Sequence, residues 1–338
     1  MSADILLTAF DAVLADLDGV VYAGPAAIPG AIDALNGLAE KNVKLAYVTN
    51  NASRTPAQVA AHLRDLGAPA DDDQVVSSAQ AGAALLATKF PAGSKVLVTG
   101  SAALAQEVLD LGMKVVASAQ DAPDVVIQGF DPALGWVDLA EATFAIKGGA
   151  AWIATNTDMT IPRDRGSLPV TGPWSQRCAP PSDLIRWLLA SLKRPCSIQP
   201  PIVWVPRRPW WWGDRLDTDI LGGNNAGMAT ALVLTGVDSG ETALRACTAE
   251  RPTFIIPTLK ELYSAYPAIE FDGATVTCGA AAATVTRGSD GESVDTVHIT
   301  GTTDDPDAWR AACAAWWAAV PRADAATTPV ITWHSTLP

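Results

Sequence analysis

The stretch DAVLADLDGVVY, which begins at Asp11, constrains this chain more than any other. Val13 and Leu14 predict a short buried strand, and two carboxylates, Asp16 and Asp18, follow at its end. Residues i and i+2 of an extended chain point to the same side, about 6–7 Å apart. Two such carboxylates repel each other unless a hard cation such as Mg²⁺, which prefers oxygen ligands, lies between them. The alternative for this pair alone is an ordinary loop acid or a helix N-cap.

Charge and composition exclude several classes of protein. The formal net charge of −13 argues against a nucleic-acid-binding surface, because such a surface needs a basic face. An anionic substrate would need a local positive centre, either a metal or a lysine. No apolar run is long enough to span a bilayer and no signal peptide is apparent, so we expect a cytoplasmic protein with no membrane partner.

The cysteines and histidines predict no site of their own. The five cysteines are odd in number and lack CxxC spacing, so we expect free thiols in a reducing compartment. We expect the three histidines, His62, His298 and His334, to form no cluster. We therefore expect neither a histidine-based metal site nor a histidine-based nucleophile.

Strands and helices alternate along the first part of the chain. A helix with an apolar stripe follows the first strand, and a strand at 45–48 leads into Thr49, Asn50 and Asn51. Open α/β sheets bind ligands at the carboxyl ends of their strands, where small hydroxyl and amide groups suit a phosphate oxygen. The same residues are compatible with a polar turn before a helix capped by Thr55. The alternation predicts a parallel sheet with helices on both faces.

The pattern restarts at about Ser78 and predicts a second, smaller α/β unit. Its expected elements are a helix after Trp136 and strands at 96–98, 115–116, 125–127 and 152–154. Beyond about Pro267 the composition changes again. There we expect a small α/β appendage with strands near Thr275 and Val297, a helix at 307–320 and a strand at 330–333.

A second acidic motif, GDRLDTD, occupies residues 213–219. Placed after a buried strand, Asp214 would complete the metal site that Asp16 opens. Asp219 would hold the metal's water or a neighbouring amide. Strands at 231–234 and 253–256 then complete the core.

The motifs DLDGVVY, VTNNAS and GDRLDTD, in this order and separated by an inserted α/β unit, resemble the haloacid dehalogenase superfamily of phosphatases. The inserted unit is similar to the large cap of the 4-nitrophenylphosphatase, phosphoglycolate and glycerol phosphate phosphatase group. The resemblance implies an α/β fold with a Rossmann-like parallel-sheet core. It further implies three domains: a catalytic core at 1–78 and 191–265, an inserted cap at 79–190 and a small C-terminal domain at 266–338.

The resemblance also implies catalytic roles. Asp16 would be the nucleophile that forms an aspartyl phosphate. Asp18 would protonate the leaving alkoxide and then activate water. The transferring phosphoryl group would be bound by Thr49, Asn50 and Asn51.

The same resemblance implies a cofactor and a specificity region. Mg²⁺ would be held by Asp16, Asp18 through its carbonyl, and Asp214, and Asp219 would support it. Substrate selection would belong to the cap, at Asn156 and Asp158. The reaction would be the hydrolysis of small phosphomonoesters, with glycerol 3-phosphate favoured on resemblance alone.

One part that the resemblance implies is missing. The family carries a lysine, in a GKP segment upstream of GD, that pairs with the nucleophile and the phosphate. That position falls near Ser191, and the nearby Lys193 lies in SLKRP instead. The alternative function is therefore a catalytically impaired homologue that binds a phosphate ligand or a protein. A phosphomutase or phosphotransferase is a third possibility. A homodimer is compatible with either the cap or the appendage as the contact surface.

The stretch 170–212 is unusual for its position. It holds six of the twelve tryptophans, and three of them are consecutive where a buried strand should deliver GDRLD. Such side chains overpack a parallel sheet. Tryptophan has the single codon TGG, so reading Trp210-Trp211-Trp212-Gly213 one base earlier gives x-Val-Val-Gly, with x Leu, Met or Val.

The same shifted frame restores other expected features. With permissible codons, the stretch from Trp187 reads VAGKPEAAMFNTAANRLG, which contains the missing GKP, and the stretch from Val170 reads GNGAMVSALRTA. We hypothesise a lost base near Pro169 to Val170 and a gained base near Trp212 to Gly213, through a sequencing error or a genuine double frameshift. The alternative is a real, divergent segment.

Overall fold

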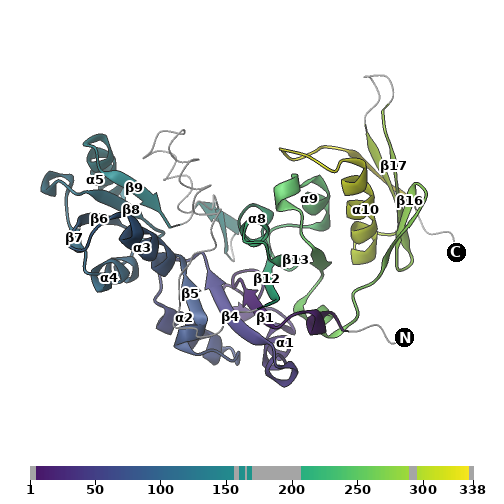
Figure 1. Cartoon of the computed structure of the whole chain (residues 1–338), viewed down its shortest axis with the longest axis horizontal. Coiled ribbons are helices and arrows are strands. Elements are labelled where there is room, and N and C mark those ends of the chain that lie inside the picture. The colour runs from purple at the N-terminus through teal and green to yellow at the C-terminus, as the bar shows by residue number, and fades with distance from the viewer. Residues whose placement is uncertain (1–4, 156–159, 164–165, 170–206, 289–294, 335–338) are drawn as a thin grey trace. The chain divides into compact units, whose positions relative to one another are not determined.

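The computed structural model describes residues 5–155, 160–163, 166–169, 207–288 and 295–334 (Figure 1). The chain divides into two compact units, which are described separately. The first comprises Met1–Val21, Ile28–Lys44 and Arg207–Pro338, and the second comprises Tyr22–Ala27 and Leu45–Pro206. No helix among the described residues has the length and apolar character needed to cross a membrane.

The core of the first unit is a run of parallel strands in the order β14-β13-β12-β1. These strands are Ala12–Ala15 (β1), Pro209–Gly213 (β12), Ala229–Val233 (β13) and Phe254–Ile256 (β14), and the helices are Ala31–Asn36 (α1), Leu221–Asn225 (α8) and Gly240–Arg245 (α9). β1 and β12 pair from Ala12↔Pro209 to Ala15↔Trp212. Because the two strands run in the same direction, Asp16 and Asp214 follow them at the same edge of the sheet.

Strand β12 contains the three consecutive tryptophans. Trp210 and Trp212 are 0% exposed, and their rings meet edge to face with centroids 5.3 Å apart. Trp210 also stacks on Phe10 at 4.3 Å. The buried indole N–H groups of Trp210, Trp211 and Trp212 have no hydrogen-bond partner in the part of the chain that the structure describes. Each unpaired buried donor costs about 1–3 kcal/mol. The expected strand therefore forms, at a polar cost that three aliphatic residues would not incur.

The C-terminal part of the first unit is a five-stranded sheet with a helix on one face (Figure 1). The order is β15-β16-β17-β18-β19, antiparallel except for the last pair. The elements are Ile269–Asp272 (β15), Thr275–Cys278 (β16), Ala281–Thr286 (β17), Thr296–Thr300 (β18), Pro306–Ala319 (α10) and Val330–His334 (β19). Trp309, Cys313 and Trp316 of α10 share one buried cluster with Leu232 and Leu244. This appendage therefore packs against the core through a common hydrophobic interior.

The second unit contains a four-stranded parallel sheet in the order β7-β6-β8-β9. Its strands are Lys95–Thr99 (β6), Lys114–Val116 (β7), Val125–Gln128 (β8) and Ala151–Ala154 (β9), and its helices are Ser78–Lys89 (α3), Ala102–Asp110 (α4) and Trp136–Lys147 (α5). Leu86, Leu104 and Ile127 belong to its buried core. The strands and the helix expected for the inserted unit are confirmed.

The remaining elements of the second unit include the predicted strand before Thr49. Among the described residues, its other strands and α-helix are Tyr22–Ala23 (β2), Ala26–Ala27 (β3), Lys44–Thr49 (β4, whose first residue belongs to the first unit), Pro56–Asp65 (α2), Val75–Ser77 (β5), Thr160–Arg163 (β10) and Gly166–Pro169 (β11). β4 and β5 are parallel, and β10 pairs antiparallel with β11. The predicted cap of α2 is confirmed, because the Thr55 hydroxyl oxygen accepts a hydrogen bond from the Gln58 N–H.

The predicted fold class is confirmed: an α/β protein with a parallel core sheet, an inserted α/β unit and a small C-terminal α/β appendage. The predicted domain boundaries stay a prediction. The stretch 170–206, which includes most of the suspected out-of-frame segment and the boundary at 190–191, lies outside the described residues.

Candidate metal centre

Three buried carboxylates, from Asp16, Asp214 and Asp219, form the centre of the first unit's site. One oxygen from each lies within 4.8 Å of the other two. The residues are 8%, 1% and 3% exposed, respectively. Among the described residues this is the only group of three or more histidine, cysteine or acidic side chains that could hold a metal ion. We call it the acid triangle.

Strand ends and a tight helical turn bring the acid triangle together. Asp16 follows β1, and its N–H donates to the Trp212 carbonyl at 2.9 Å, so the pairing with β12 continues to the site. Asp214 directly follows β12. Asp219 lies on a single π-helical turn, Leu216–Ile220, which directs its carboxylate back toward the two strand ends.

Glycines make the space that these carboxylates occupy. A Cβ at Gly19 or at Gly236 would overlap the Asp214 carboxylate, and one at Gly213 would overlap Asp219. Gly19 also has a φ of +90°, which side chains rarely adopt. The positions around the acid triangle therefore need glycine on steric grounds.

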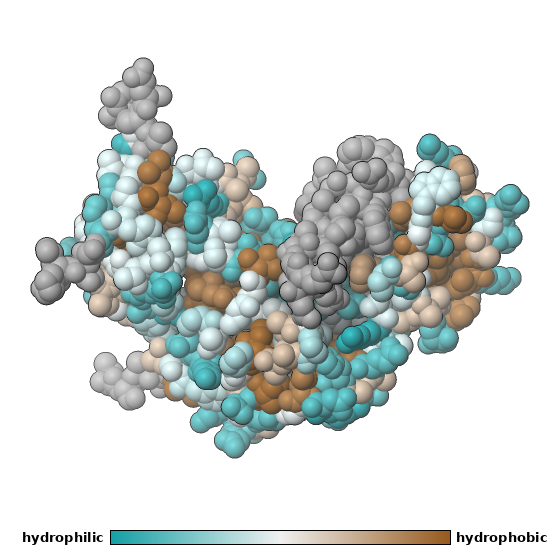
Figure 2. All heavy atoms as spheres, turned by 180° about the vertical axis from the view of Figure 1, so that it is seen from behind, coloured by the Kyte–Doolittle hydropathy of each residue, from teal (hydrophilic) through white to brown (hydrophobic). Residues whose placement is uncertain are grey.

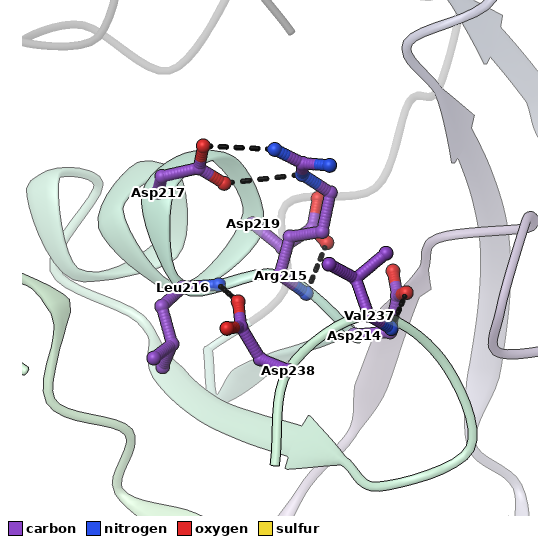
Figure 3. Close-up of polar contacts among 7 residues, drawn as sticks. All are labelled: Asp214, Arg215, Leu216, Asp217, Asp219, Val237 and Asp238. Carbon is purple, nitrogen blue, oxygen red and sulfur yellow. Dashed lines mark hydrogen bonds and ion pairs between the residues drawn. The ribbon is translucent and has the colours of Figure 1, made fainter. Parts of the chain in front are cut away.

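The loop after β13 fixes Asp214 from two sides (Figure 3). The Val237 N–H donates to Asp214 Oδ2 at 2.7 Å, and the Asp238 N–H donates to the Asp214 carbonyl at 3.0 Å. The Asp238 carboxylate in turn accepts the Leu216 N–H at 2.7 Å. Asp238 therefore links the residue that follows β12 to the start of the turn that carries Asp219.

Further hydrogen bonds hold the neighbouring backbone. The Arg215 N–H donates to Asp219 Oδ2 at 3.1 Å, whereas the Arg215 guanidinium binds Asp217 through both carboxylate oxygens (Figure 3). The Thr235 hydroxyl donates to the Gly19 carbonyl at 2.6 Å. The loop after β13 is thus tied to the turn that follows Asp16 and Asp18.

The electrostatics of the acid triangle favour a cation. Burial raises the pKa of Asp16 well above its usual range, and the carboxylates of Asp219, Asp214 and Asp18 raise it further. Burial also raises the pKa of Asp214 to about 6, although the Val237 N–H opposes this shift. Buried carboxylates this close together are costly unless a positive charge compensates them. An all-oxygen donor set fits a hard divalent cation such as Mg²⁺ or Ca²⁺.

The residues predicted to bind phosphate follow β4 in the second unit. Thr49 is buried at the strand end, and its hydroxyl oxygen accepts the Asn51 N–H at 3.1 Å. Asn51 Oδ1 accepts both the N–H and the hydroxyl of Ser53, and the Asn50 carbonyl accepts the Ser78 hydroxyl. The three residues therefore form an ordered polar turn. Their role toward a phosphoryl group stays a prediction.

The other predicted site residues are placed only in part. Asp18 is half-buried, two residues after Asp16. Asn156 and Asp158 of the cap, and Ser191 and Lys193 near the expected lysine position, lie outside the described residues.

Sequence reasoning missed the loop Thr235–Asp238. It begins two residues after the end of β13, as Asp16 follows the end of β1 and Asp214 follows the end of β12. The rule that ligand-binding residues lie at the carboxyl ends of parallel strands could have indicated it. Its main contribution, the Val237 N–H, is a backbone group that carries no signal in the sequence.

Comparisons with known proteins identify the family of this chain. A family described as haloacid dehalogenase-like hydrolase matches residues 13–114, and one described as HAD-hydrolase-like matches residues 179–262. The chain is 39% identical over 267 residues to the D-glycerol 3-phosphate phosphatase of Mycobacterium tuberculosis. The aligned region covers 75% of this chain and 71% of that protein. It is 33% identical over 243 residues to the acid sugar phosphatase of Staphylococcus aureus, which covers 69% of this chain and 89% of that protein.

Solved structures extend the likeness to the fold. The glycerol phosphate phosphatase of Mycobacterium tuberculosis in complex with magnesium matches with a TM-score of 0.75 and 32% identity, covering 99% of this chain and 96% of that one. Its complex with calcium matches with the same TM-score and 34% identity, covering 98% and 95%. The chain belongs to the haloacid dehalogenase-like hydrolases, and within them to the phosphoric monoester hydrolases.

Proposed function

We propose that the chain hydrolyses small phosphomonoesters in an Mg²⁺-dependent reaction that passes through a phosphorylated Asp16. The observation that carries the proposal is the acid triangle, which lies at the carboxyl ends of two paired parallel strands. Support for a divalent cation comes from the related glycerol phosphate phosphatase, which has been solved with calcium and with magnesium. When bound, the cation neutralises charge on the phosphoryl group as it is transferred.

The two acids of the first motif divide the chemistry. Asp16 attacks the phosphorus atom, so that one difficult displacement becomes two easier ones. Asp18 gives a proton to the leaving alkoxide and then takes one from the water that cleaves the aspartyl phosphate. Asp16, Asp214 and the Asp18 carbonyl would hold Mg²⁺, and Asp219 would support it. Because the donors are fixed by strand ends and hydrogen bonds, little reorganisation is needed during the reaction.

Other proposed roles rest on position in the chain. Thr49, Asn50 and Asn51 bind the transferring phosphoryl group, since they end a parallel strand with hydroxyl and amide groups. Asn156 and Asp158 contribute to substrate choice from the cap. The site partner is a small phosphorylated metabolite. A homodimer and a cytoplasmic location belong to the same proposal.

Glycerol 3-phosphate is the proposed substrate. The relative named D-glycerol 3-phosphate phosphatase is 39% identical to this chain, and the one named acid sugar phosphatase is 33% identical. One name gives glycerol 3-phosphate and the other a sugar phosphate, and both are small phosphorylated compounds. A small sugar phosphate is the second candidate.

Phosphate release from three substrates tests the proposal. Purified protein is assayed with glycerol 3-phosphate, glucose 6-phosphate and 4-nitrophenyl phosphate, with Mg²⁺ and with EDTA. We expect the highest kcat/KM for glycerol 3-phosphate and no turnover with EDTA. If kcat/KM is higher for glucose 6-phosphate, the sugar phosphate replaces glycerol 3-phosphate as the proposed substrate. Turnover in EDTA would overturn the role of the cation.

The alternative of a catalytically impaired homologue has no support from the comparisons. It rests on the missing lysine, whose expected position lies outside the described residues. We retain the proposal that residues 170–212 are out of frame. The three unpaired indole N–H groups of β12 favour it, because the shifted reading replaces them with aliphatic side chains.

A further inference from the structure

Two of the three histidines lie together, so the expectation that they form no cluster is wrong. His298 on β18 and His334 on β19 have ring centroids 5.6 Å apart. The parallel register pairs His298 with Thr332, two residues before His334, so the three side chains share one face of the sheet. That face is opposite α10, because the alternate residues Val297 and Ile299 are buried in the core with the helix. In Figure 2 the C-terminal part of the chain, at the left, shows mostly pale and hydrophilic side chains.

Three donor atoms converge on this face. His298 Nδ1 lies 2.7 Å from Thr332 Oγ1 and 3.5 Å from His334 Nε2, and the remaining pair, Thr332 Oγ1 and His334 Nε2, is 3.4 Å apart. Two imidazole nitrogens bound tetrahedrally to zinc at 2.0–2.1 Å would be about 3.3–3.4 Å apart. The two histidine nitrogens are therefore already at nearly the separation that one metal ion requires. The 2.7 Å between Thr332 Oγ1 and His298 Nδ1 is a hydrogen bond, which a bound ion would replace and lengthen.

The second ring nitrogen of His298 also has a suitable partner. His298 Nε2 lies 3.1 Å from the Thr286 hydroxyl on β17. Metal-binding histidines almost always donate their other ring N–H to an oxygen, which fixes the tautomer and leaves the facing nitrogen as the ligand. With the proton on Nε2, His298 presents the lone pair of Nδ1 toward Thr332 and His334. A metal-binding histidine and a surface histidine that is only hydrogen-bonded share this arrangement. The affinity for a metal ion distinguishes the two.

We propose that His298, His334 and the Thr332 hydroxyl bind a divalent transition-metal ion. Imidazole nitrogen prefers Cu²⁺, Ni²⁺ and Zn²⁺, whereas Mg²⁺ prefers oxygen ligands. The group is therefore chemically distinct from the acid triangle. A bound ion would link the last strand, β19, to β18, which lies inside the sheet. His334 is exposed, so the remaining coordination positions are open to water or to another ligand.

Copper binding by the untagged, full-length protein tests the proposal. Cu²⁺ is titrated in the presence of saturating Mg²⁺, which occupies the acid triangle, and the bound ion is examined by electron paramagnetic resonance. We expect one tightly bound Cu²⁺ per chain with hyperfine coupling to two imidazole nitrogens. His334→Ala should weaken binding by more than about tenfold and Thr286→Val by about tenfold, since loss of an outer partner typically costs 10–100-fold. His62→Ala, which removes the third histidine, should leave the affinity unchanged.

Two outcomes would overturn the proposal. One is equal Cu²⁺ affinity of the wild type and His334→Ala, and the other is coupling to fewer than two nitrogens. His334 is exposed at the end of β19, so its replacement removes no core packing. His298→Ala should also weaken binding by more than about tenfold. If circular dichroism shows that this variant is unfolded, His334→Ala and Thr286→Val decide the result on their own.

Discussion

The acid triangle and the histidine group of β18 and β19 differ in almost every physical property. The acid triangle is buried and offers only oxygen ligands. It is surrounded by glycines at which an added Cβ would overlap the carboxylates. The histidine group lies on an exposed sheet face, offers nitrogen, and has one threonine as its outer partner. Burial makes the ionised carboxylates costly without a compensating cation, and the exposed His334 does not carry this cost. The acid triangle therefore indicates the reaction, and the histidine group indicates at most a binding property.

Replacing the nucleophile of the acid triangle should have the largest effect on activity. Asp16→Asn keeps the shape of the nucleophile and removes its reactivity, so we expect a loss of more than about 10³-fold in kcat. Phosphate release from glycerol 3-phosphate measures it. The matched control is Asp217→Asn in the same acidic motif, because Asp217 binds the Arg215 side chain and is not part of the acid triangle. Turnover that survives in Asp16→Asn would remove Asp16 as the nucleophile.

Restoring the shifted reading frame over residues 170–212 should have the next largest effect, on both kcat and Tm. A gene in which residues 170–212 follow the shifted frame restores GKP and replaces the tryptophans of β12. We expect kcat to rise by about 10²–10³-fold, the usual effect of one charge-stabilising group, and Tm to rise as well. Ser191→Lys in the printed chain is the control and should not restore full activity. Equal activity and equal Tm of the two genes would support a real, divergent segment.

Replacing Asp238, which links Asp214 to the start of the turn that carries Asp219, should have a smaller effect on the acid triangle. Asp238→Ala leaves the Leu216 N–H without its acceptor, and we expect Mg²⁺ affinity to fall about tenfold. Asp238→Asn keeps an acceptor oxygen and should remain close to the wild type. Isothermal titration with Mg²⁺ measures both variants. Equal affinities of Asp238→Ala and the wild type would show that the loop does not position the ligands, and neither variant should alter Cu²⁺ binding.

The pH dependence of stability gives the smallest effect. An aspartate has a pKa of about 3.9 in an unfolded chain, and burial raises the pKa of Asp214 to about 6. Between these values the metal-free folded protein binds more protons than the unfolded chain, so its free energy of unfolding falls as pH rises. Mg²⁺ needs ionised carboxylates, so the rise in Tm on adding Mg²⁺ should be larger at pH about 7 than at pH about 4.5. A rise in Tm that does not depend on pH would contradict this account of Asp214.

The sequence predicted what local patterns encode. The apolar run at Val13 and Leu14 and the Thr55 cap each depend on neighbours within a few residues, and the structure agrees with both. Asp16 and Asp214 each follow a predicted strand, and the pairing of β1 with β12 brings them together. Contacts set by strand register were not predictable in this way. His298 and His334 meet only because β19 pairs parallel to β18 in one register.

Backbone groups were the other gap. The Val237 N–H reaches Asp214 because of the shape of the loop after β13, and any residue except proline could supply it. We expected Asp219 to hold the metal's water or a neighbouring amide, and this role stays a prediction. The π-helical turn brings its carboxylate oxygen within 4.8 Å of those of Asp16 and Asp214. The sequence contains the acids, and the turn geometry decides which of them meet.

Mg²⁺ titration of phosphate release in the wild type and in Asp214→Asn tests the central claim most directly. Asparagine keeps an oxygen that can accept the Val237 N–H and removes one negative charge from the acid triangle. With glycerol 3-phosphate as substrate, we expect saturable dependence on Mg²⁺ in the wild type, and in Asp214→Asn an Mg²⁺ requirement raised by more than about tenfold. The same Mg²⁺ requirement in both proteins, or phosphate release without any divalent cation, would contradict the claim that the acid triangle holds the catalytic metal.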